Sequence, residues 1–535
     1  MRIHLTRTGA ERPVAEAIPG EALKALEDLP DVHGAFSIED FPTQKDLKYT
    51  HEDAEGFLDY LENWHAKNFW YRDGGVATWA YGETYDNWQD TYGVDAVLCA
   101  YTSSHGGMGA DGNFSVAMGS DWAKTGLSAR SWDMRIGNEQ ANYVWWSTCK
   151  SVRIIGDNNP IRTWGPASKG FRMMFGYETN SVDSADYGGD FWDEWNEGKS
   201  LSTAFLDASW EIDTDQIPVV FAVGATQAEA QNRVFNERFL AWPHAADNWF
   251  WWRWYEKANP ARREPNTRLP EQPLIAVLTR RVVDTDYVGQ VLRRHHLDLA
   301  LPRQVIANLR GTFHFGDARH RVAFRRDGTY LIEYAKPNLS NSRPLSEDRA
   351  VKLAERHLAE YGLEDGLELT FDFVRYGKLA GGSKEGRERT EAFTGETTVE
   401  FTQIVNDTPV ISPKAGRLRV TIDNDATVTR VENRTRPVAG LTRSSKETHP
   451  GPRQKLRMRD LEIYRRLLAQ GWRRERRIDE ARGQPPATMR LVPGTDEIGY
   501  LVDGDEMGLF AKGLIEIETK GGFAKRYRVV APIVR

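Results

Sequence analysis

The stretch VDAVLCAYTSSHGGMG, residues 94–109, joins an apolar run to two serines, a histidine and two glycines. Short continuous apolar runs are typical of strands that are buried on both faces, as in a parallel sheet. Gly106 and Gly107 allow the backbone to turn sharply and to approach another group closely directly after His105. The stretch therefore predicts a buried strand that ends in a histidine.

Apolar runs of the same kind recur along the first half of the chain, with helical patterns around them. The further strand candidates are NYVWWST (142–148), KGFRMMFGY (169–177) and IPVVFAV (217–223), and the helical candidates cover 52–64, 198–210 and 226–242. Strands that alternate with helices predict an α/β fold with a mainly parallel sheet.

The second half has a different pattern. Segments 320–334, 397–411 and 416–433 alternate apolar and polar residues around Asp-Gly, Asn-Asp and Asp-Asn-Asp turns, which is typical of antiparallel hairpins. One helix is expected between Ser346 as N-cap and Gly362 just past its end. This half is therefore predicted to be α+β.

Tryptophan usage and a proline-rich stretch set the expected boundaries. Seventeen of the 18 tryptophans precede residue 255, and KANPARREPNTRLPEQP (257–273) has the composition of an exposed linker. The expected parts are an N-terminal extension (1–50), an α/β domain (51–256), the linker (257–273), an α+β domain (274–440) and a basic helix with C-terminal hairpins (441–535).

Cys149 ends the strand candidate YVWWSTC, just as His105 ends the candidate before it. If the two strands are parallel neighbours, thiol and imidazole meet at the carboxyl edge of the sheet, where open α/β sheets bind ligands. An imidazole, with the cation of Lys150, favours the reactive thiolate. The amides of Gly106 and Cys149 are then candidate donors to a developing oxyanion.

These motifs carry a resemblance to a known group of enzymes. An apolar strand ending in SHGG, followed by one ending in STC, resembles the clan of cysteine peptidases that contains caspases, legumains, gingipains and clostripain. The resemblance covers about residues 55–240. It implies a caspase-like three-layer fold and a catalytic dyad of His105 and Cys149. Asp183 and Asp186 are candidates for selecting a basic substrate residue, with a solvated loop as the alternative.

The second half carries a resemblance of its own. The segment VEFTQIVNDTPVI is similar to propeptide-like domains of the PepSY and fungalysin/thermolysin propeptide group, on the matches Phe401, Gln403, Pro409 and Val410. The resemblance covers roughly residues 345–437. It implies a domain that folds against the catalytic half and chaperones or restrains it.

Other residues suggest other sites with less support. Acidic residues among tryptophans in GGDFWDEWNEG (188–198) are compatible with a glycosidase, although charged helix entries are commoner. The stretch DGDEMG (503–508) begins like a calcium loop but has Leu514 at the twelfth position. We therefore expect no metal and no cofactor.

Composition limits the partners. The net charge of -7 gives no reason to expect nucleic acid, and no apolar run is long enough to cross a membrane. The basic residues between Arg443 and Arg482 are expected to form a solvated helix face. No secretory signal is visible at the start of the sequence, which favours a cytoplasmic location, with secretion as the alternative if a leader was removed. Of the two cysteines, Cys99 is expected to pack in the core.

The sequence thus predicts a cysteine peptidase that acts on a peptide or protein substrate through a thioester. A peptide ligase or cyclase of the same kind is the nearest alternative. A non-catalytic peptide-binding module and a glycosidase are the others. Contact between the two halves, and self-processing within residues 257–273, are further hypotheses.

Overall fold

The computed structural model describes residues 13, 31–258, 266, 268–443, 488–519 and 522–534. Three predicted segments therefore lie wholly or partly outside the described residues. They are the first 30 residues of the extension, about half of the linker at 257–273, and the basic helix between residues 443 and 482.

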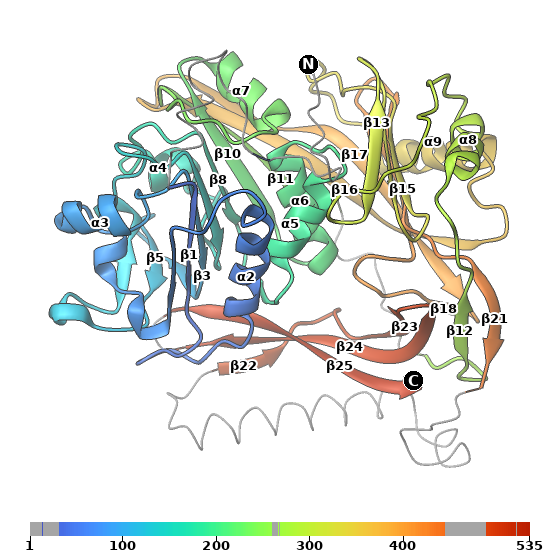
Figure 1. The fold of residues 1–535 in the computed structure, drawn as a ribbon, viewed down its shortest axis with the longest axis horizontal. Helices are drawn as coiled ribbons and strands as arrows, with labels where there is room; N and C mark the ends of the chain where they lie inside the picture. Colours follow the sequence, from blue (N-terminus) through green and yellow to red (C-terminus); the bar gives the residue numbers. More distant parts are fainter. Residues whose placement is uncertain are drawn as a thin grey trace.

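One large mixed sheet runs through both halves of the chain (Figure 1). In spatial order its strands are β13 (Thr312–Gly316), β14 (Arg321–Arg325), β15 (Tyr330–Glu333), β20 (Val428–Asn433), β19 (Arg417–Asp423), β17 (Arg389–Val405), β16 (Glu368–Ser383), β11 (Trp249–Lys257), β10 (Pro218–Gly224), β8 (Met173–Tyr177), β7 (Tyr143–Ser147), β3 (Cys99–Ser103), β1 (His33–Ser37) and β2 (Phe69–Arg72), with β18 (Thr408–Pro409) paired to β17. The neighbours from β2 to β8 are parallel, and every pair from β8 to β13 is antiparallel.

A second sheet joins the C-terminal strands to the N-terminal half. Its order is β21 (Val438–Thr442), β12 (Ile275–Leu278), β24 (Glu506–Glu518), β25 (Ala524–Val534), β4 (Gly106–Met108), β5 (Phe114–Ala117) and β6 (Ser128–Arg130); β22 (Thr488–Leu491) and β23 (Glu497–Asp503) pair with β24, and β9 (Val182–Asp183) pairs with β25. In Figure 1 the long hairpin β24–β25, in red, passes below both halves of the molecule. Segments far apart in sequence therefore share one sheet.

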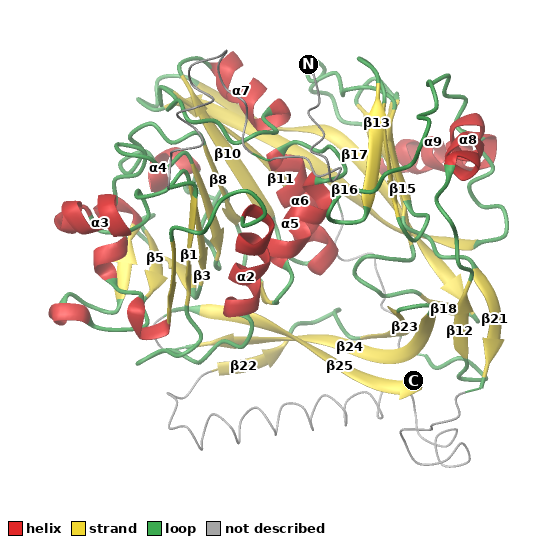
Figure 2. Ribbon diagram, in the orientation of Figure 1, coloured by secondary structure: helices red, strands yellow, loops and turns green. Residues whose placement is uncertain are grey.

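Among the described residues the helices are fewer than the strands (Figure 2). They are α2 (Thr50–Leu61), α3 (Asp86–Tyr92), α4 (Pro160–Trp164), α5 (Tyr187–Trp195), α6 (Leu201–Ile212), α7 (Gln227–Asn236), α8 (Thr285–Arg294) and α9 (Glu347–Glu360). Side chains at the start of several helices accept a hydrogen bond from the first turn, as N-caps do; Ser346, for example, accepts from the amide of Arg349. Gly362 follows α9 with φ +59°, as expected for a residue just past a helix end.

The predicted fold class is wrong. Strands account for 36% of the structure and helices for 21%, in large mixed and antiparallel sheets, so this is not a helix-rich three-layer α/β fold of the caspase type. Apolar runs such as IPVVFAV occur equally in antiparallel strands buried on both faces, and β10 is one of these. The two halves also share one sheet, because β16 of the second half pairs with β11 of the first over nine residues.

The parallel part of the sheet is buried on both faces, which explains its continuous apolar runs. Trp146 belongs to one large apolar cluster, and its neighbour Trp145 belongs to another on the opposite face. Before β7, the buried carboxylate of Asp95 accepts hydrogen bonds from the amides of five successive residues, 137 to 141. These bonds fix the loop from which β7 starts.

Candidate functional site

The register of two parallel strands determines where His105 and Cys149 lie. β3 and β7 are direct neighbours, and Ser103 is paired with Ser147. His105 and Cys149 each follow two residues later, at the same end of the sheet. The expectation that these strands are parallel neighbours is confirmed.

The backbone confirms how closely the two strand ends approach. A Cβ atom built on Gly106 lies 2.4 Å from the carbonyl oxygen of Cys149 and 2.9 Å from Cβ of Thr148. No side chain fits at such a distance, so the residue after His105 has to be glycine for the strand ends to meet.

The imidazole of His105 is buried and held in one tautomer. Its Nε2 lies 2.7 Å from the carbonyl oxygen of Lys45, so Nε2 carries the proton and donates it. Among the described residues, Nδ1 has no hydrogen-bond partner of normal geometry, although an interaction of the ring with the backbone of Ala524 acts to raise its pKa. Burial lowers the pKa of His105 to about 3, and the nearby cations of Lys525 and Lys45 act in the same direction.

The thiol of Cys149 is fully buried beside Ser181. The amide of Ser181 donates to Sγ over 3.2 Å, and the Ser181 hydroxyl lies 3.6 Å from the same sulfur. In the part of the chain that the structure describes, no hydrogen bond joins this thiol to the imidazole. Both cysteines are free, and Cys99 is buried in β3, as expected for a core residue.

A strand from the far end of the sequence covers this edge. Ala524, the first residue of β25, pairs with Gly106, and the ring of Phe523 lies 6.5 Å from the His105 ring between centroids. The next residue, Lys525, is only 1% exposed. Its ammonium donates to the carbonyl oxygen of Ser147 over 3.3 Å and to the Ser181 hydroxyl over 3.1 Å.

The two aspartates suggested for substrate selection lie in different places. Asp183 is buried on β9, where its carboxylate accepts a hydrogen bond from the amide of Lys48 over 3.0 Å. Burial raises its pKa to about 6, and the charge of Lys525 is the main opposing effect. Asp186 is exposed at the start of α5 and bonds to the Ser184 hydroxyl. Asp183, unlike Asp186, therefore lies on a strand that pairs with β25, which covers the histidine.

Sequence reasoning missed the residues that β25 brings to the site. Lys525 and Ala524 lie about 375 positions beyond Cys149, in an alternating segment without any motif. Ser181 follows β8 and carries no signal of its own. Only the pairing of β25 with β4 and β9 reveals them.

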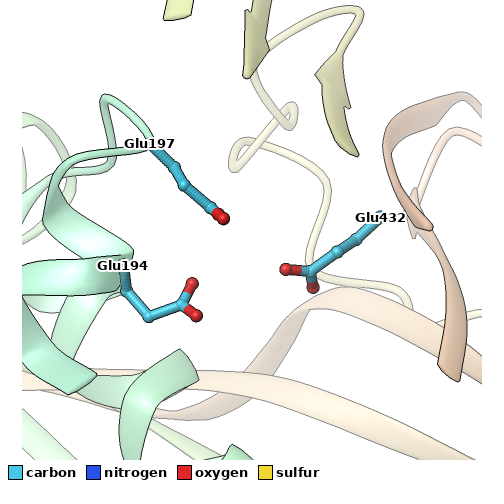
Figure 3. A group of neighbouring side chains, drawn as sticks. All are labelled: Glu194, Glu197 and Glu432. Atoms are coloured by element: carbon cyan, nitrogen blue, oxygen red, sulfur yellow. The ribbon is translucent and has the colours of Figure 1, made fainter. Parts of the chain in front are cut away.

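The acidic stretch 188–198 forms a second cluster, which lies where the two halves meet. Figure 3 shows Glu194 and Glu197 turned toward Glu432 of β20, close enough for one cation to contact all three. That position is taken by protein cations. The ammonium of Lys199 lies 3.1 Å from Glu197 and 3.4 Å from Glu432, and Arg434 bonds to all three glutamates.

The other two acidic residues of that stretch are also paired with cations. Asp190 bonds to Lys414, and Asp193 bonds to Arg310. Burial raises the pKa of Asp190 to about 7, and Asp193 is partly exposed, but each carboxylate is paired with a cation. The cluster is therefore an electrostatic contact between the halves.

The other motifs of the second half are parts of hairpins. Gln403 on β17 bonds through its side chain to both the amide and the carbonyl of Arg436, and Pro409 on β18 pairs with Ile404. The stretch 503–508 is the turn between β23 and β24, with Asp503 paired to Glu506. No described helix is long and apolar enough to cross a membrane.

Comparison with known proteins places the site inside one matched region. Residues 35–256 match a family described as a domain of unknown function (DUF6345). This range contains His105, Cys149 and Asp183 but not β25. No curated protein matches the chain. The chain is thus similar to this family over its first half, and the family's description names no activity.

Proposed function

We propose that the chain is a cysteine peptidase in which Cys149 is the nucleophile and His105 is the general base and acid. The observation that carries this proposal is the register of β3 and β7, which brings a thiol and an imidazole to the same sheet edge. A resemblance of the SHGG and STC motifs to the clan of caspases and legumains supports the same roles.

The chemistry follows from these positions. Nδ1 of His105 takes the thiol proton, and Sγ of Cys149 attacks the scissile carbonyl carbon of a bound peptide. The amides of Gly106 and Cys149 stabilise the oxyanion. As the C–N bond breaks, the imidazolium gives its proton to the leaving amine, and a thioester remains. Water, deprotonated by the same imidazole, then hydrolyses the thioester and restores the thiol.

The test compares the two cysteines within one chain. Iodoacetamide labelling, followed by peptide mapping, gives separate rates for Cys149 and Cys99. Because β25 lies over the site, the measurement is made on the wild type and on the full-length variant Ala524→Pro, each with and without His105→Ala. We expect Cys149 to react at least tenfold faster than Cys99 in one of these backgrounds, and His105→Ala to remove most of that difference.

Peptide cleavage provides the second measurement. A peptide library is incubated with the same proteins, and Cys149→Ala is the control in which any cleavage must stop. Two results together would refute the peptidase. The first is that labelling of Cys149 does not depend on His105 in either background. The second is that cleavage survives Cys149→Ala or is never seen.

A further inference from the structure

Lys525 is a cation in an unusual place. Its side chain is buried, yet among the described residues its ammonium bonds only to a backbone carbonyl, that of Ser147, and to the hydroxyl of Ser181. Lysines are rarely buried to this extent without a paired carboxylate, because removing an ammonium ion from water is costly. The surroundings of Lys525 must therefore be suited to a positive charge.

These surroundings adjoin the thiol. Ser147 ends β7, two residues before Cys149, and the Ser181 hydroxyl that accepts from Lys525 also lies 3.6 Å from Sγ of Cys149. Asp183, two residues further on, is buried on β9 next to β25. A carbonyl oxygen and a hydroxyl oxygen thus contact the ammonium beside the proposed nucleophile, and the charge of Lys525 also acts to lower the pKa of Asp183. We call the position that the Lys525 side chain fills the Lys525 pocket and assign Ser147, Ser181 and Asp183 to it.

The backbone on either side of Lys525 follows the same edge. Ala524 pairs with Gly106, the proposed oxyanion residue, and the amide of Arg526 donates to the carbonyl oxygen of Ser181 over 3.1 Å. Peptides that add to an exposed sheet edge bind in the same way: their main chain bonds to the edge strand, and alternate side chains enter pockets.

We propose that the Lys525 pocket is the specificity site for a basic side chain of the peptide substrate, and that β25 blocks the enzyme by filling this pocket with its own lysine. The substrate class is a peptide with lysine at the recognised position. This inference rests on the proposed peptidase function.

The first experiment opens the cover. Ala524→Pro removes the backbone N–H of the residue that pairs with Gly106, and Lys525→Ala empties the pocket while the strand can still pair. We expect each variant to raise the iodoacetamide labelling rate of Cys149 at least tenfold over the wild type. Val530→Pro is the matched control, because Val530 lies on the same strand and pairs with Lys512 of β24, away from the site. Equal rates in the wild type, Ala524→Pro and Lys525→Ala would refute the blocking role.

The second experiment tests the pocket without requiring catalysis. In Lys525→Ala, n-propylammonium ion has the length and charge of the atoms removed, from Cγ to Nζ. We expect millimolar n-propylammonium to raise the melting temperature of this variant by a few degrees, but not that of the wild type or of Lys525→Ala with Asp183→Asn. Propan-1-ol, of the same length and uncharged, is the control. No stabilisation, or equal stabilisation by the alcohol, would refute a site for basic side chains.

The third measurement links the pocket to the substrate. Peptides that differ only in Lys, Arg, Leu or Asp at one position are offered to Ala524→Pro. We expect cleavage after Lys to exceed cleavage after Leu or Asp at least tenfold, and Asp183→Asn to reduce this preference. Cleavage that prefers Leu or Asp would refute the substrate class but leave the peptidase standing. A different result would refute the peptidase but leave the pocket. In that case the ammonium ion binds Lys525→Ala and Ala524→Pro exposes Cys149, yet neither labelling nor cleavage depends on His105.

Discussion

Gly106 connects backbone geometry directly to the proposed chemistry. It is the residue at which the two strand ends touch, since its α-carbon faces the carbonyl of Cys149 and the side chains of Thr148 and Phe114. A methyl group there meets backbone, which cannot rotate away. The neighbouring Gly107 faces only contacts of 3.5 Å or more, at ordinary van der Waals distance. An added methyl group therefore collides with the backbone at Gly106 but fits at Gly107.

We predict that Gly106→Ala lowers the free energy of unfolding by about 2 kcal/mol, because the added methyl forces β3 and β7 apart at their ends. Gly107→Ala is the matched control and should change it by less than about 0.5 kcal/mol. Denaturant unfolding of the two variants and the wild type measures both values. Equal destabilisation by the two substitutions would contradict the close approach at Gly106.

The strand β25 changes the environment of His105 because it covers the edge of the sheet where this imidazole lies. Burial and the charge of Lys525 both lower the pKa of His105, to about 3 from the ordinary value of 6.5. In this covered state the imidazole stays neutral down to pH values well below those of the cell. Removing the cover admits water and withdraws the cation, and both changes favour the protonated form.

We therefore predict that Ala524→Pro raises the pKa of His105 toward 6.5. Histidine-selective isotope labelling with NMR detection follows the titration, and His105→Ala identifies the signal. In the wild type this signal should not titrate between pH 7 and 5, whereas in the variant most of its shift should fall in that range. A titration near pH 6 in the wild type would show that β25 does not cover the ring.

The sequence predicted some elements well and others not at all, for physical reasons. The strands before His105 and Cys149, and the helix between Ser346 and Gly362, follow from local patterns that the structure confirms. Strand direction does not follow from such patterns, because an apolar run is equally suited to a parallel or an antiparallel neighbour. The fold class was wrong for this reason, and the position of Lys525 beside Cys149 depends on the pairing of segments far apart in the sequence.

At the scale of the whole molecule, buried charges connect the two halves. Lys199 lies 2.9 Å from Asp207 and 3.4 Å from Glu432 of β20, and it also bonds to Glu194. These attractions raise the pKa of Lys199, and the cations around Glu197 lower the pKa of that carboxyl to about 2. Since a lowered carboxyl pKa favours the folded state only while the group is ionised, this stabilisation is lost as the pH falls from about 4.5 toward 2.

We predict that Lys199→Met lowers the free energy of unfolding by about 3 to 5 kcal/mol at pH 7, because the buried carboxylates lose a shared cation. The matched control is Lys67→Met, which removes a lysine from a partly exposed pair with Glu62 and should cost less than about 1 kcal/mol. Chemical denaturation at pH 7 measures both. If Lys199→Met lowered the free energy of unfolding by less than about 1 kcal/mol, the arginines around these carboxylates would be enough to compensate their charge.

The position of β25 in the sequence also has a consequence for timing. Cys149 and Lys525 are separated by 376 positions, so at ordinary rates of translation roughly 20 to 75 s pass between the synthesis of the one and of the other. During this interval the strands that carry His105 and Cys149 exist without β25. If β25 blocks the proposed peptidase, the site is therefore open during synthesis and is covered only after residues 524–534 have left the ribosome.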